Sequence, residues 1–141
     1  MNSRKTQVED CKLISLPKIH NRAGNITALE NQKNIPFDVK RIYYLYDVPS
    51  NEGRGGHAHY ELKQYLVAAT GSFDVALNDG KNTKIITLNK PDMALLIVPG
   101  LWRELQNFSG GAICLVLASH EFDEKDYIRD FNNYREWKLS K

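Results

Sequence analysis

The sequence predicts an all-β fold, a barrel or jelly roll, that ends in a short helix. Segments in which apolar and polar residues alternate recur along the chain, and they are rich in β-branched and aromatic side chains. Gly, Pro and Asn-Asp positions separate these segments. The longest apolar stretches, residues 93–99 and 112–118, have the length of a strand. Strands this short and this regularly spaced are typical of a barrel or a two-sheet jelly roll.

The expected strands follow one another with turn signals between them. They are residues 12–16, 25–30, 39–47, 62–70, 71–77, 84–88, 93–98, 101–107 and 112–119. A turn at residues 21–24 separates the first two, and Asn78-Asp79-Gly80 predicts a tight turn before residues 84–88. The pattern predicts the strands without determining their order in the sheets.

The two ends of the chain carry different signals. Residues 123–134 are expected to form a terminal helix, because Asp123 can cap it and Glu124 and Asp126 complement the helix dipole. Residues 1–10 are polar and lack the apolar segment of a signal peptide, so they predict a mobile head. No apolar run approaches the about 18 residues of a membrane-spanning helix. We therefore expect a single cytoplasmic domain over residues 1–141.

The composition is that of an ordinary globular domain. The 141 residues are 42% hydrophobic and 26% charged, which excludes a disordered or collagen-like chain. The 19 Lys and Arg residues against 17 Asp and Glu residues give a net charge of +2, too little for a nucleic acid or an anionic membrane as partner. Cys11 and Cys114 are far apart and have no metal-binding neighbours, so reduced thiols are expected.

Two of the four histidines, His57 and His59, are separated by a single residue. If residues 56–60 are extended, both imidazoles lie on one face of a strand, and in a small barrel that face is the cavity. Two histidines beside a Gly-rich loop can also be no more than solvated side chains. The spacing is, in addition, that of a metal site, since imidazole binds zinc, iron and nickel.

The wider spacing around this pair resembles the two motifs of the cupin superfamily. The matching positions are His57, His59, Gln64, Gly71, Pro99, Gly100, Arg103 and Asn107. Metal-binding cupins have a glutamate where this chain has Gln64 and a third histidine where it has Arg103. A neutral amide is a poor metal ligand, and a guanidinium has no lone pair to offer. We therefore expect a cupin barrel without a metal, in which the two histidines carry protons near neutral pH.

Alternation divides the strand over residues 39–47 into two faces. One face carries Ile42, Tyr44 and Tyr46, and the other carries Arg41, Tyr43 and Leu45. One of these sets is expected to line the pocket, and periodicity does not decide which. The other set packs as ordinary aromatic and aliphatic residues of a sheet.

Further candidates for ligand binding lie outside that strand. Arg54 is flanked by glycines that let the backbone approach a ligand, and arginine suits bidentate phosphate recognition. Arg22 lies in the turn at residues 21–24 and has a similar character. Trp102 can stack on a base or a sugar, or it can belong to the core. Taken singly, both arginines are also compatible with an ordinary surface position.

Nearly the whole chain resembles one family of metal-free cupins, the nucleotide-sugar 3,4-ketoisomerases that act on dTDP-4-keto-6-deoxyglucose. The segments that carry the resemblance are residues 34–37, 40–44, 54–59, 62–64, 70–72, 102–104, 116–119 and 123–129. The family implies a homodimer of jelly-roll barrels, often with an N-terminal strand exchanged between subunits. It also implies a reaction that needs no cofactor, because the electrons move within the sugar.

The implied reaction moves the keto group of the sugar from C-4 to C-3 through an enediol or enediolate. The resemblance assigns the two proton transfers to His57 and His59, and we favour Tyr44 as a relay. The binding residues that it implies are Arg22, Arg41, Arg54, Gln64, Trp102 and Arg103. Arginines there would offset the charge of the diphosphate or of the enediolate. The product would supply a PLP-dependent aminotransferase that makes a 3-amino-3,6-dideoxyhexose.

Several alternatives stay open. The C-4 configuration of the product, gluco or galacto, does not follow from Arg22 and Arg103, and neither does the identity of the base. A 3,5-epimerase on the same nucleotide sugar is disfavoured, because no aspartate partner for a histidine is evident in the sequence. A non-catalytic cupin that binds sugars belongs to a different class of function. A metal-dependent dioxygenase fits least well, given Gln64 and Arg103.

Overall fold

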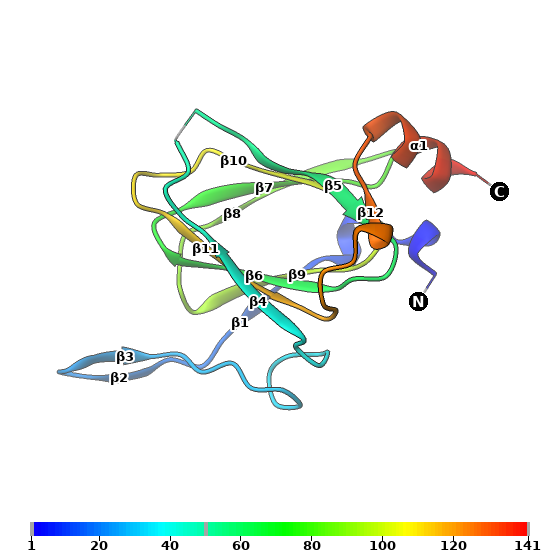
Figure 1. Cartoon of the computed structure of the whole chain (residues 1–141). Helices are drawn as coiled ribbons and strands as arrows, with labels where there is room; N and C mark the ends of the chain where they lie inside the picture. Colours follow the sequence, from blue (N-terminus) through cyan, green and yellow to red (C-terminus); the bar gives the residue numbers. More distant parts are fainter. Residues whose placement is uncertain (1, 50, 141) are drawn as a thin grey trace.

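The structure is a computed structural model that describes residues 2–49 and 51–140, with only the backbone of residues 54 and 55. In this part of the chain, two five-stranded antiparallel sheets lie face to face (Figure 1). The first contains β1 (Lys12–Ser15), β9 (Met93–Ile97), β6 (Gln64–Thr70), β11 (Ile113–Ala118) and β4 (Arg41–Leu45). The second contains β12 (Tyr127–Ile128), β5 (Arg54–His59), β10 (Trp102–Gln106), β7 (Phe73–Asn78) and β8 (Thr83–Leu88). The predicted all-β jelly roll is confirmed.

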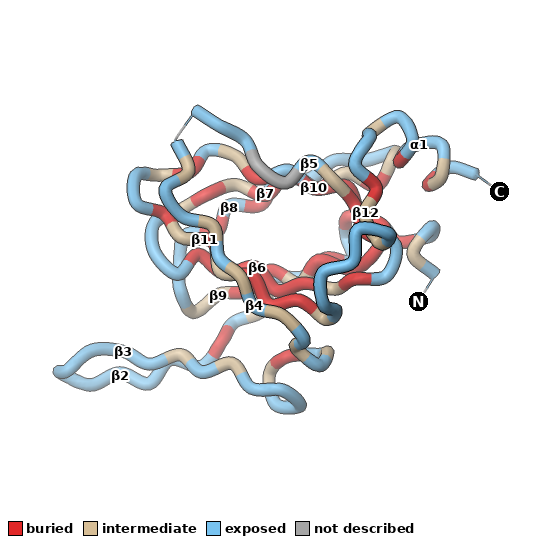
Figure 2. Tube along the Cα trace, viewed as in Figure 1, coloured by how far each residue is buried: buried red, intermediate tan, exposed pale blue. Residues whose placement is uncertain are grey.

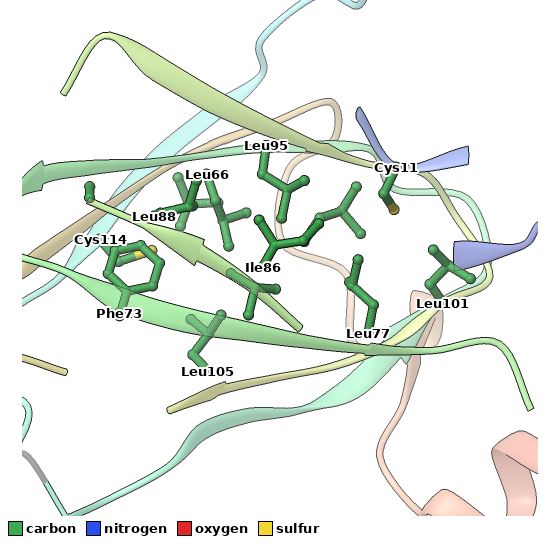
Figure 3. Packing of buried hydrophobic residues seen from close by; sticks show 14 of the residues in the cluster. Cys11, Leu66, Phe73, Leu77, Ile86, Leu88, Leu95, Leu101, Leu105 and Cys114 are labelled. Carbon is green, nitrogen blue, oxygen red and sulfur yellow. The ribbon is translucent and has the colours of Figure 1, made fainter. Parts of the chain in front are cut away.

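The interior between the sheets is filled by apolar side chains. In β7, buried residues alternate with half-buried ones, as expected for a strand with one face on a core. Figure 3 shows Phe73 and Leu77 of this strand close to leucines of the opposite sheet, among them Leu66. Each fully buried leucine contributes about 2 kcal/mol to stability. Leu66, Leu105 and Val116 of this core also form a wall of the cavity described below.

A hairpin near the N-terminus leaves the body of the molecule. It consists of β2 (Ile19–Asn21) and β3 (Gly24–Ile26), joined by a turn at the predicted place. The strand expected over residues 25–30 is therefore shorter than predicted. Figures 1 and 2 show the hairpin projecting away from the two sheets, with every residue of both strands exposed. Ile19 and Ile26 are 61% and 59% exposed, which is unusual for paired isoleucines.

The C-terminal segment differs from the prediction of one helix over residues 123–134. Asp123 caps a short 3-10 helix, η3 (Glu124–Asp126), by accepting a hydrogen bond from the backbone of Lys125. The chain then forms β12 against β5, since Tyr and Ile favour strands and find a free sheet edge. The helix α1 (Phe131–Leu139) begins later, with Asp130 as its N-cap. The prediction of a terminal helix was right in kind and wrong in position.

The N-terminal residues, for which the sequence predicts a mobile head, are packed against the body of the molecule in the structure. They form η1 (Ser3–Lys5) and η2 (Val8–Asp10), and Val8 is only 2% exposed. The Thr6 hydroxyl lies 2.7 Å from the carbonyl oxygen of Pro99, and the Lys138 ammonium donates to the Ser3 carbonyl at 2.8 Å. The two ends of the chain therefore lock together beside the turn that follows β9.

Two further expectations concern cysteines and membranes. Cys11 and Cys114 are both buried and unpaired. Burial raises the pKa of both thiols, that of Cys114 to about 12, so neither is activated as a nucleophile. Within the described residues, no helix combines the length and the apolar character needed to cross a membrane.

Candidate active site

A cavity of about 470 Å³ opens between the two sheets. Its polar lining comes from strands that are distant in sequence, namely Arg41 and Tyr43 of β4, His57 of β5, Gln64 of β6, Arg103 of β10 and Tyr127 of β12. Arg129 lies at its rim, so three arginines contribute to the lining. Among the lining residues that the structure describes, none carries a carboxylate. The cavity is therefore suited to a ligand with negative charge.

Strand β5 places the two histidines as the i, i+2 spacing predicts. Their Nε2 atoms lie 3.1 Å apart, and the rings meet edge to face with centroids 4.8 Å apart. Only His57 lines the cavity, whereas His59 is 0% exposed and lies behind it. The Nδ1 atom of His59 lies 3.2 Å from Oδ2 of Asp126, so three side chains form one hydrogen-bonded row.

Asp126 is a site residue that sequence reasoning missed, because it was assigned to a helix. The 3-10 helix η3 instead holds its carboxylate against the end of β5, where it accepts hydrogen bonds from the backbone N–H groups of Glu61 and Leu62. Burial acts to raise the pKa of Asp126, but the hydrogen bonds from His59 and from these two backbone groups outweigh it and lower the pKa. Asp126 is therefore ionised at neutral pH, and its carboxylate accepts a hydrogen bond from the Nδ1–H group of His59.

The protonation of the histidine row follows from these contacts. Burial lowers the pKa of His59 to about 4, although the hydrogen bond to Asp126 acts in the opposite direction. His59 is thus neutral near pH 7, with its hydrogen on Nδ1 facing Asp126 and a lone pair on Nε2. In the neutral pair, His57 then donates from Nε2 to His59, and Nδ1 of His57 carries the lone pair of a base.

Of two neighbouring tyrosines on β4, the structure places Tyr43 in the cavity and Tyr44, the expected relay, on the other face of the strand. Tyr44 is 58% exposed on the outer face of β4, so the structure does not bring it to the cavity of its own chain. Tyr43 points inward, and its hydroxyl oxygen accepts a hydrogen bond from Nε2 of Gln64 at 3.0 Å. The inward face of the strand is the one with Arg41, Tyr43 and Leu45. Periodicity alone could not choose between the faces because both are rich in tyrosine and aliphatic residues.

Gln64 and Arg103 occupy the positions where metal-binding cupins have a glutamate and a histidine. Both are 2% exposed, and Nη1 of Arg103 donates to Oε1 of Gln64. The amide oxygen already accepts this hydrogen bond, and the positive charge of the guanidinium would repel a metal cation. These residues do not fit a metal centre of the cupin type. A second nitrogen of the guanidinium, Nη2, is buried and has no hydrogen-bond partner among the described residues.

Other aromatic and basic residues of the cavity were partly foreseen. Arg41 lines it as predicted, with its guanidinium stacked 4.7 Å from the centroid of the Tyr43 ring. Tyr127 was missed as a site residue, and its ring lies 5.1 Å from that of His57. Phe122 and Arg129 were missed as well; Arg129 stacks over Tyr127 and is paired with Glu124. The only sequence signal for Tyr127 and Arg129 was the family-like tail over residues 123–129, and Phe122 had none.

Two predicted binding residues do not line the cavity, and a third has no described side chain. Trp102 is 7% exposed and packs in a separate cluster with Phe131 and Tyr134 of the C-terminal helix, because it points to the opposite side of β10 from Arg103. Arg22 lies in the exposed turn of the projecting hairpin. The Arg54 side chain lies outside the described part of the structure, although its backbone pairs with β10.

Comparison with known proteins places this site in a family. Residues 9–138 match the family model described as FdtA, WxcM-like, C-terminal. The chain belongs to this family. A curated WxcM-like relative, the TDP-4-oxo-6-deoxy-α-D-glucose-3,4-oxoisomerase of Aneurinibacillus thermoaerophilus, is 43% identical over 126 residues, which are 89% of this chain and 91% of the relative.

Solved structures agree with the membership in the WxcM-like family. A 3,4-ketoisomerase from Helicobacter canadensis superposes with a TM-score of 0.91 at 45% identity, covering 93% of this chain and 98% of that chain. A histidine-to-asparagine mutant of a 3,4-ketoisomerase from Thermoanaerobacterium thermosaccharolyticum, in complex with TDP-4-keto-6-deoxyglucose, gives a TM-score of 0.90 at 38% identity, covering 92% and 94%. The resemblance drawn from the sequence is confirmed.

The argument against a 3,5-epimerase changes with the structure. The expectation that no aspartate partners a histidine is wrong, since Asp126 contacts His59 at 3.2 Å. The histidine–aspartate pair therefore no longer counts against an epimerase. What favours isomerisation is the similarity of this WxcM-like chain, over most of its length, to ketoisomerases.

Proposed function

We propose that this protein is an isomerase that moves the keto group of dTDP-4-keto-6-deoxyglucose from C-4 to C-3. The observation that carries the proposal is the row from His57 to Asp126, which ends at a cavity with three arginines and no described carboxylate in its lining. Relatives that are similar over most of their length act on, or bind, a TDP-linked 4-keto sugar. The product is a TDP-linked 3-keto-6-deoxyhexose, for use in the biosynthesis of 3-amino-3,6-dideoxyhexoses.

The reaction needs one group that transfers a proton between C-3 and C-4 and one that transfers a proton between O-3 and O-4. The hydrogen on C-3 is acidic because it lies next to the C-4 carbonyl, and its removal leaves an enediolate with negative charge on O-4. A proton then bonds to C-4, and the C-3 hydroxyl loses its proton as the new carbonyl forms. In total, one hydrogen moves from C-3 to C-4 and one from O-3 to O-4. The reaction is therefore balanced without any cofactor.

His57 is the proposed base at carbon. It is the histidine that lines the cavity, and in the neutral row its Nδ1 carries a lone pair. When His57 takes the C-3 proton, the imidazolium that forms lies beside neutral His59, whose other nitrogen faces the ionised Asp126. His59 is thus a positioning residue in this proposal and does not reach the sugar itself. The same imidazolium, or a second donor on the other side of the ring, returns a proton to C-4.

Tyr43 takes the place of Tyr44 as the relay between the two oxygens. Its hydroxyl lies inside the cavity, and one phenol can donate to O-4 while it accepts from O-3. Burial raises the pKa of Tyr43, and the charge of Arg103 and the hydrogen bond from Gln64 act only partly against this. The phenol therefore carries its proton at neutral pH and is able to donate it.

Arg41 and Arg103 are proposed to hold the negative charge of the ligand. Arg41 has a buried Nε atom without a partner in the described part of the chain, and Arg103 has its free Nη2. Burial lowers the pKa of Arg103, yet a guanidinium stays charged under ordinary conditions. A diphosphate or an enediolate supplies the missing acceptors. Arg54 remains a proposed diphosphate ligand on the strength of the family resemblance.

We also propose that the working form is a homodimer. The projecting hairpin exposes Ile19 and Ile26, and the edge strand β4 exposes Ile42 at 61% and Tyr44 at 58%. Apolar residues on a hairpin and on a free sheet edge favour pairing with a second copy of the chain. An exchanged hairpin would carry Arg22 to the site of the other subunit, which accounts for its distance from the cavity of its own chain. A nucleotide-sugar substrate and two unpaired thiols favour the cytoplasm as the place of action.

The test is to incubate the purified protein with dTDP-4-keto-6-deoxyglucose in deuterated water and to follow the sugar by NMR. We expect the carbonyl to move to C-3 and deuterium to appear at C-4. In a parallel reaction in ordinary water, the coupling of the C-4 proton reports the gluco or galacto configuration. An unchanged sugar that nevertheless binds would support a non-catalytic cupin. Deuterium at C-5 would support a 3,5-epimerase. Either outcome would contradict the proposed isomerase.

A further inference from the structure

Gln64 is a buried amide that joins two groups of the cavity which do not touch one another directly. Its Oε1 accepts a hydrogen bond from Nη1 of Arg103, and its Nε2 donates to the hydroxyl oxygen of Tyr43 at 3.0 Å. The orientation of this amide follows from chemistry, because a guanidinium only donates hydrogen bonds. The amide oxygen must face Arg103, and the amide nitrogen must therefore face Tyr43.

This orientation determines what Tyr43 and Arg103 present to a ligand. The Tyr43 oxygen already accepts from Gln64, so its own hydrogen is directed elsewhere, and the structure shows no acceptor for it among the described residues. In the guanidinium of Arg103, Nη1 donates a hydrogen bond to Gln64 and Nε donates one to the Leu101 carbonyl. The third nitrogen, Nη2, is a buried donor without a partner among the described residues. Both residues line the same cavity. Two free donors thus belong to groups that a single amide connects.

We propose that Gln64 is a positioning residue that directs the Tyr43 hydroxyl and the Arg103 Nη2 group, both as donors, at the oxygen on which the enediolate charge forms. This inference rests on the proposed ketoisomerase function and deepens it. In this proposal, Gln64, at the position of the cupin glutamate, has a role in the reaction. An amide there provides one acceptor and one donor, and a carboxylate would provide acceptors only.

The electrostatics of the site agree with this role. The charge on Arg103 polarises the Gln64 amide, and the amide in turn donates to the phenol oxygen, which makes the phenol hydrogen a better donor. No carboxylate forms an ion pair with Arg103 in the part of the chain that the structure describes. Its positive charge is therefore available to an enediolate. Donors that are fixed before the reaction stabilise developing charge without reorganisation.

The balance of the oxygen-centred step is simple. As the C-3 proton leaves for His57, charge develops on O-4, and Tyr43 transfers its phenol proton to that oxygen. The phenolate oxygen then takes the proton from the O-3 hydroxyl as the C-3 carbonyl forms, so Tyr43 is regenerated. Arg103 and Gln64 transfer nothing. They hold the geometry and stabilise the charge.

The sharpest test is Gln64→Glu, which preserves shape, reverses the hydrogen bond to Tyr43 and places a carboxylate beside Arg103. A carboxylate at this position still accepts from Arg103, but it also accepts the hydrogen of Tyr43 and so turns that donor away from the sugar. We expect kcat to fall by about 100-fold, the loss typical for one donor to a developing oxyanion, with KM changed by less than about threefold. If Gln64 were only structural, the isosteric carboxylate beside Arg103 would be tolerated and kcat would be unchanged, which would overturn the proposal.

The matched control is Gln106→Glu, the same substitution on β10 at a residue that does not line the cavity, and its kcat should stay within about twofold of the wild type. All assays contain a chelator, since the carboxylate introduced by Gln64→Glu would offer a third metal ligand beside His57 and His59. Circular dichroism and the melting temperature report whether the variants fold. If Gln64→Glu unfolds, Gln64→Met replaces it, because Met neither donates to Tyr43 nor accepts from Arg103, so both donors lose their fixed direction and kcat should again fall.

A coupling experiment distinguishes positioning from general damage. If Gln64 acts through Tyr43, then Gln64→Glu should lower kcat by less than about threefold in a Tyr43→Phe background, far less than its effect alone. Equal effects in both backgrounds would contradict the proposal. Deuterium incorporation by the wild type tests the underlying function separately. A wild type that isomerises the sugar while Gln64→Glu is unaffected would refute this inference alone.

Discussion

The two polar walls of the cavity are built alike and end in opposite charges. One wall is the row His57, His59 and Asp126, and it ends in a carboxylate. The other is the row Tyr43, Gln64 and Arg103, and it ends in a guanidinium. In each row, the charged residue at one end determines the direction of the hydrogen bonds and hence what His57 or Tyr43, at the other end, offers to a ligand. The histidine wall offers a lone pair, and the tyrosine wall offers a hydrogen.

This difference teaches how a cupin barrel can perform proton transfer in place of metal binding. A metal site needs lone pairs converging from all sides. Here, two of the four ligand positions offer no lone pair to a metal, because Gln64 and Arg103 occupy them with an engaged amide and a cation. His57 pairs in register with Arg103 on the neighbouring strand, and Tyr43 belongs to the other sheet, so a base and anion-stabilising donors line one cavity. Enolisation next to a carbonyl needs this combination.

The largest expected effect is on the front residue of the histidine wall. We predict that His57→Asn lowers kcat by about 10⁴-fold, since an amide is not a base near neutral pH, while dTDP binding changes little. The measurement is turnover by NMR together with calorimetry for dTDP. The control is His120→Asn, an exposed histidine that does not line the cavity and should leave turnover unchanged. Activity in the His57 variant would remove the histidine wall from the mechanism.

The matching change on the tyrosine wall compares two neighbours in one strand. Tyr43→Phe removes the inward hydroxyl and should lower kcat by about 100-fold, because one donor to the enediolate is lost. Tyr44→Phe removes the outward hydroxyl and should change kcat by less than about twofold. Steady-state kinetics on both variants gives the comparison. The reverse order of effects would mean that Tyr44 reaches a site, as in an assembly that the single chain does not show.

A smaller effect is expected at the back of the histidine wall. Asp126→Asn cannot keep all its contacts, because an amide has one oxygen for the backbone N–H groups of Glu61 and Leu62 and for Nδ1 of His59. If the amide nitrogen faces His59, the tautomer of that ring is reversed. We predict a loss in kcat on the order of tenfold, as for other residues that orient a functional histidine. The pH–rate profile should change shape as well, whereas a purely structural loss would lower the rate equally at all pH values.

The smallest effect concerns stability and pH. The folded-state pKa of His59 is lowered to about 4 from its ordinary 6.5, so the unfolded chain binds this proton more readily than the folded chain. The resulting stability is fully present above pH 6.5 and is lost as the pH falls from 6.5 towards 4. Between pH 7 and pH 5.5, the loss from His59 should be about 1 kcal/mol.

Urea denaturation at both pH values measures this loss. In the His59→Asn variant, the difference in unfolding free energy between the two pH values should be smaller by about 1 kcal/mol than in the wild type. An identical pH dependence in both proteins would show that His59 is not buried in the neutral form.

Much of the fold was predictable because its signals are local. Alternation and turn residues located the strands of both sheets except β5 and β12, and the His-x-His spacing predicted that both imidazoles share one face if β5 is extended. The tail was harder, since residues 123–134 satisfy helix-capping rules as well as they satisfy the observed turn and strand. Pairing of Tyr127 and Ile128 with β5 decided that competition. Such pairing is a contact between residues far apart in sequence, and no local rule contains it.

In the candidate site too, some features follow from the sequence and others only from contacts in the folded chain. By itself, the sequence determined that His57, Gln64 and Arg103 occupy positions of a cupin site and that two of the four metal ligands are missing, because residue type and spacing suffice for both conclusions. Only the tertiary structure decided that Tyr43, and not Tyr44, faces the cavity, and that Asp126 supports His59. The physical reason is that a strand has two equivalent faces until a second sheet covers one of them. Which charge lies behind each catalytic group is then settled by strands that meet only in the folded chain.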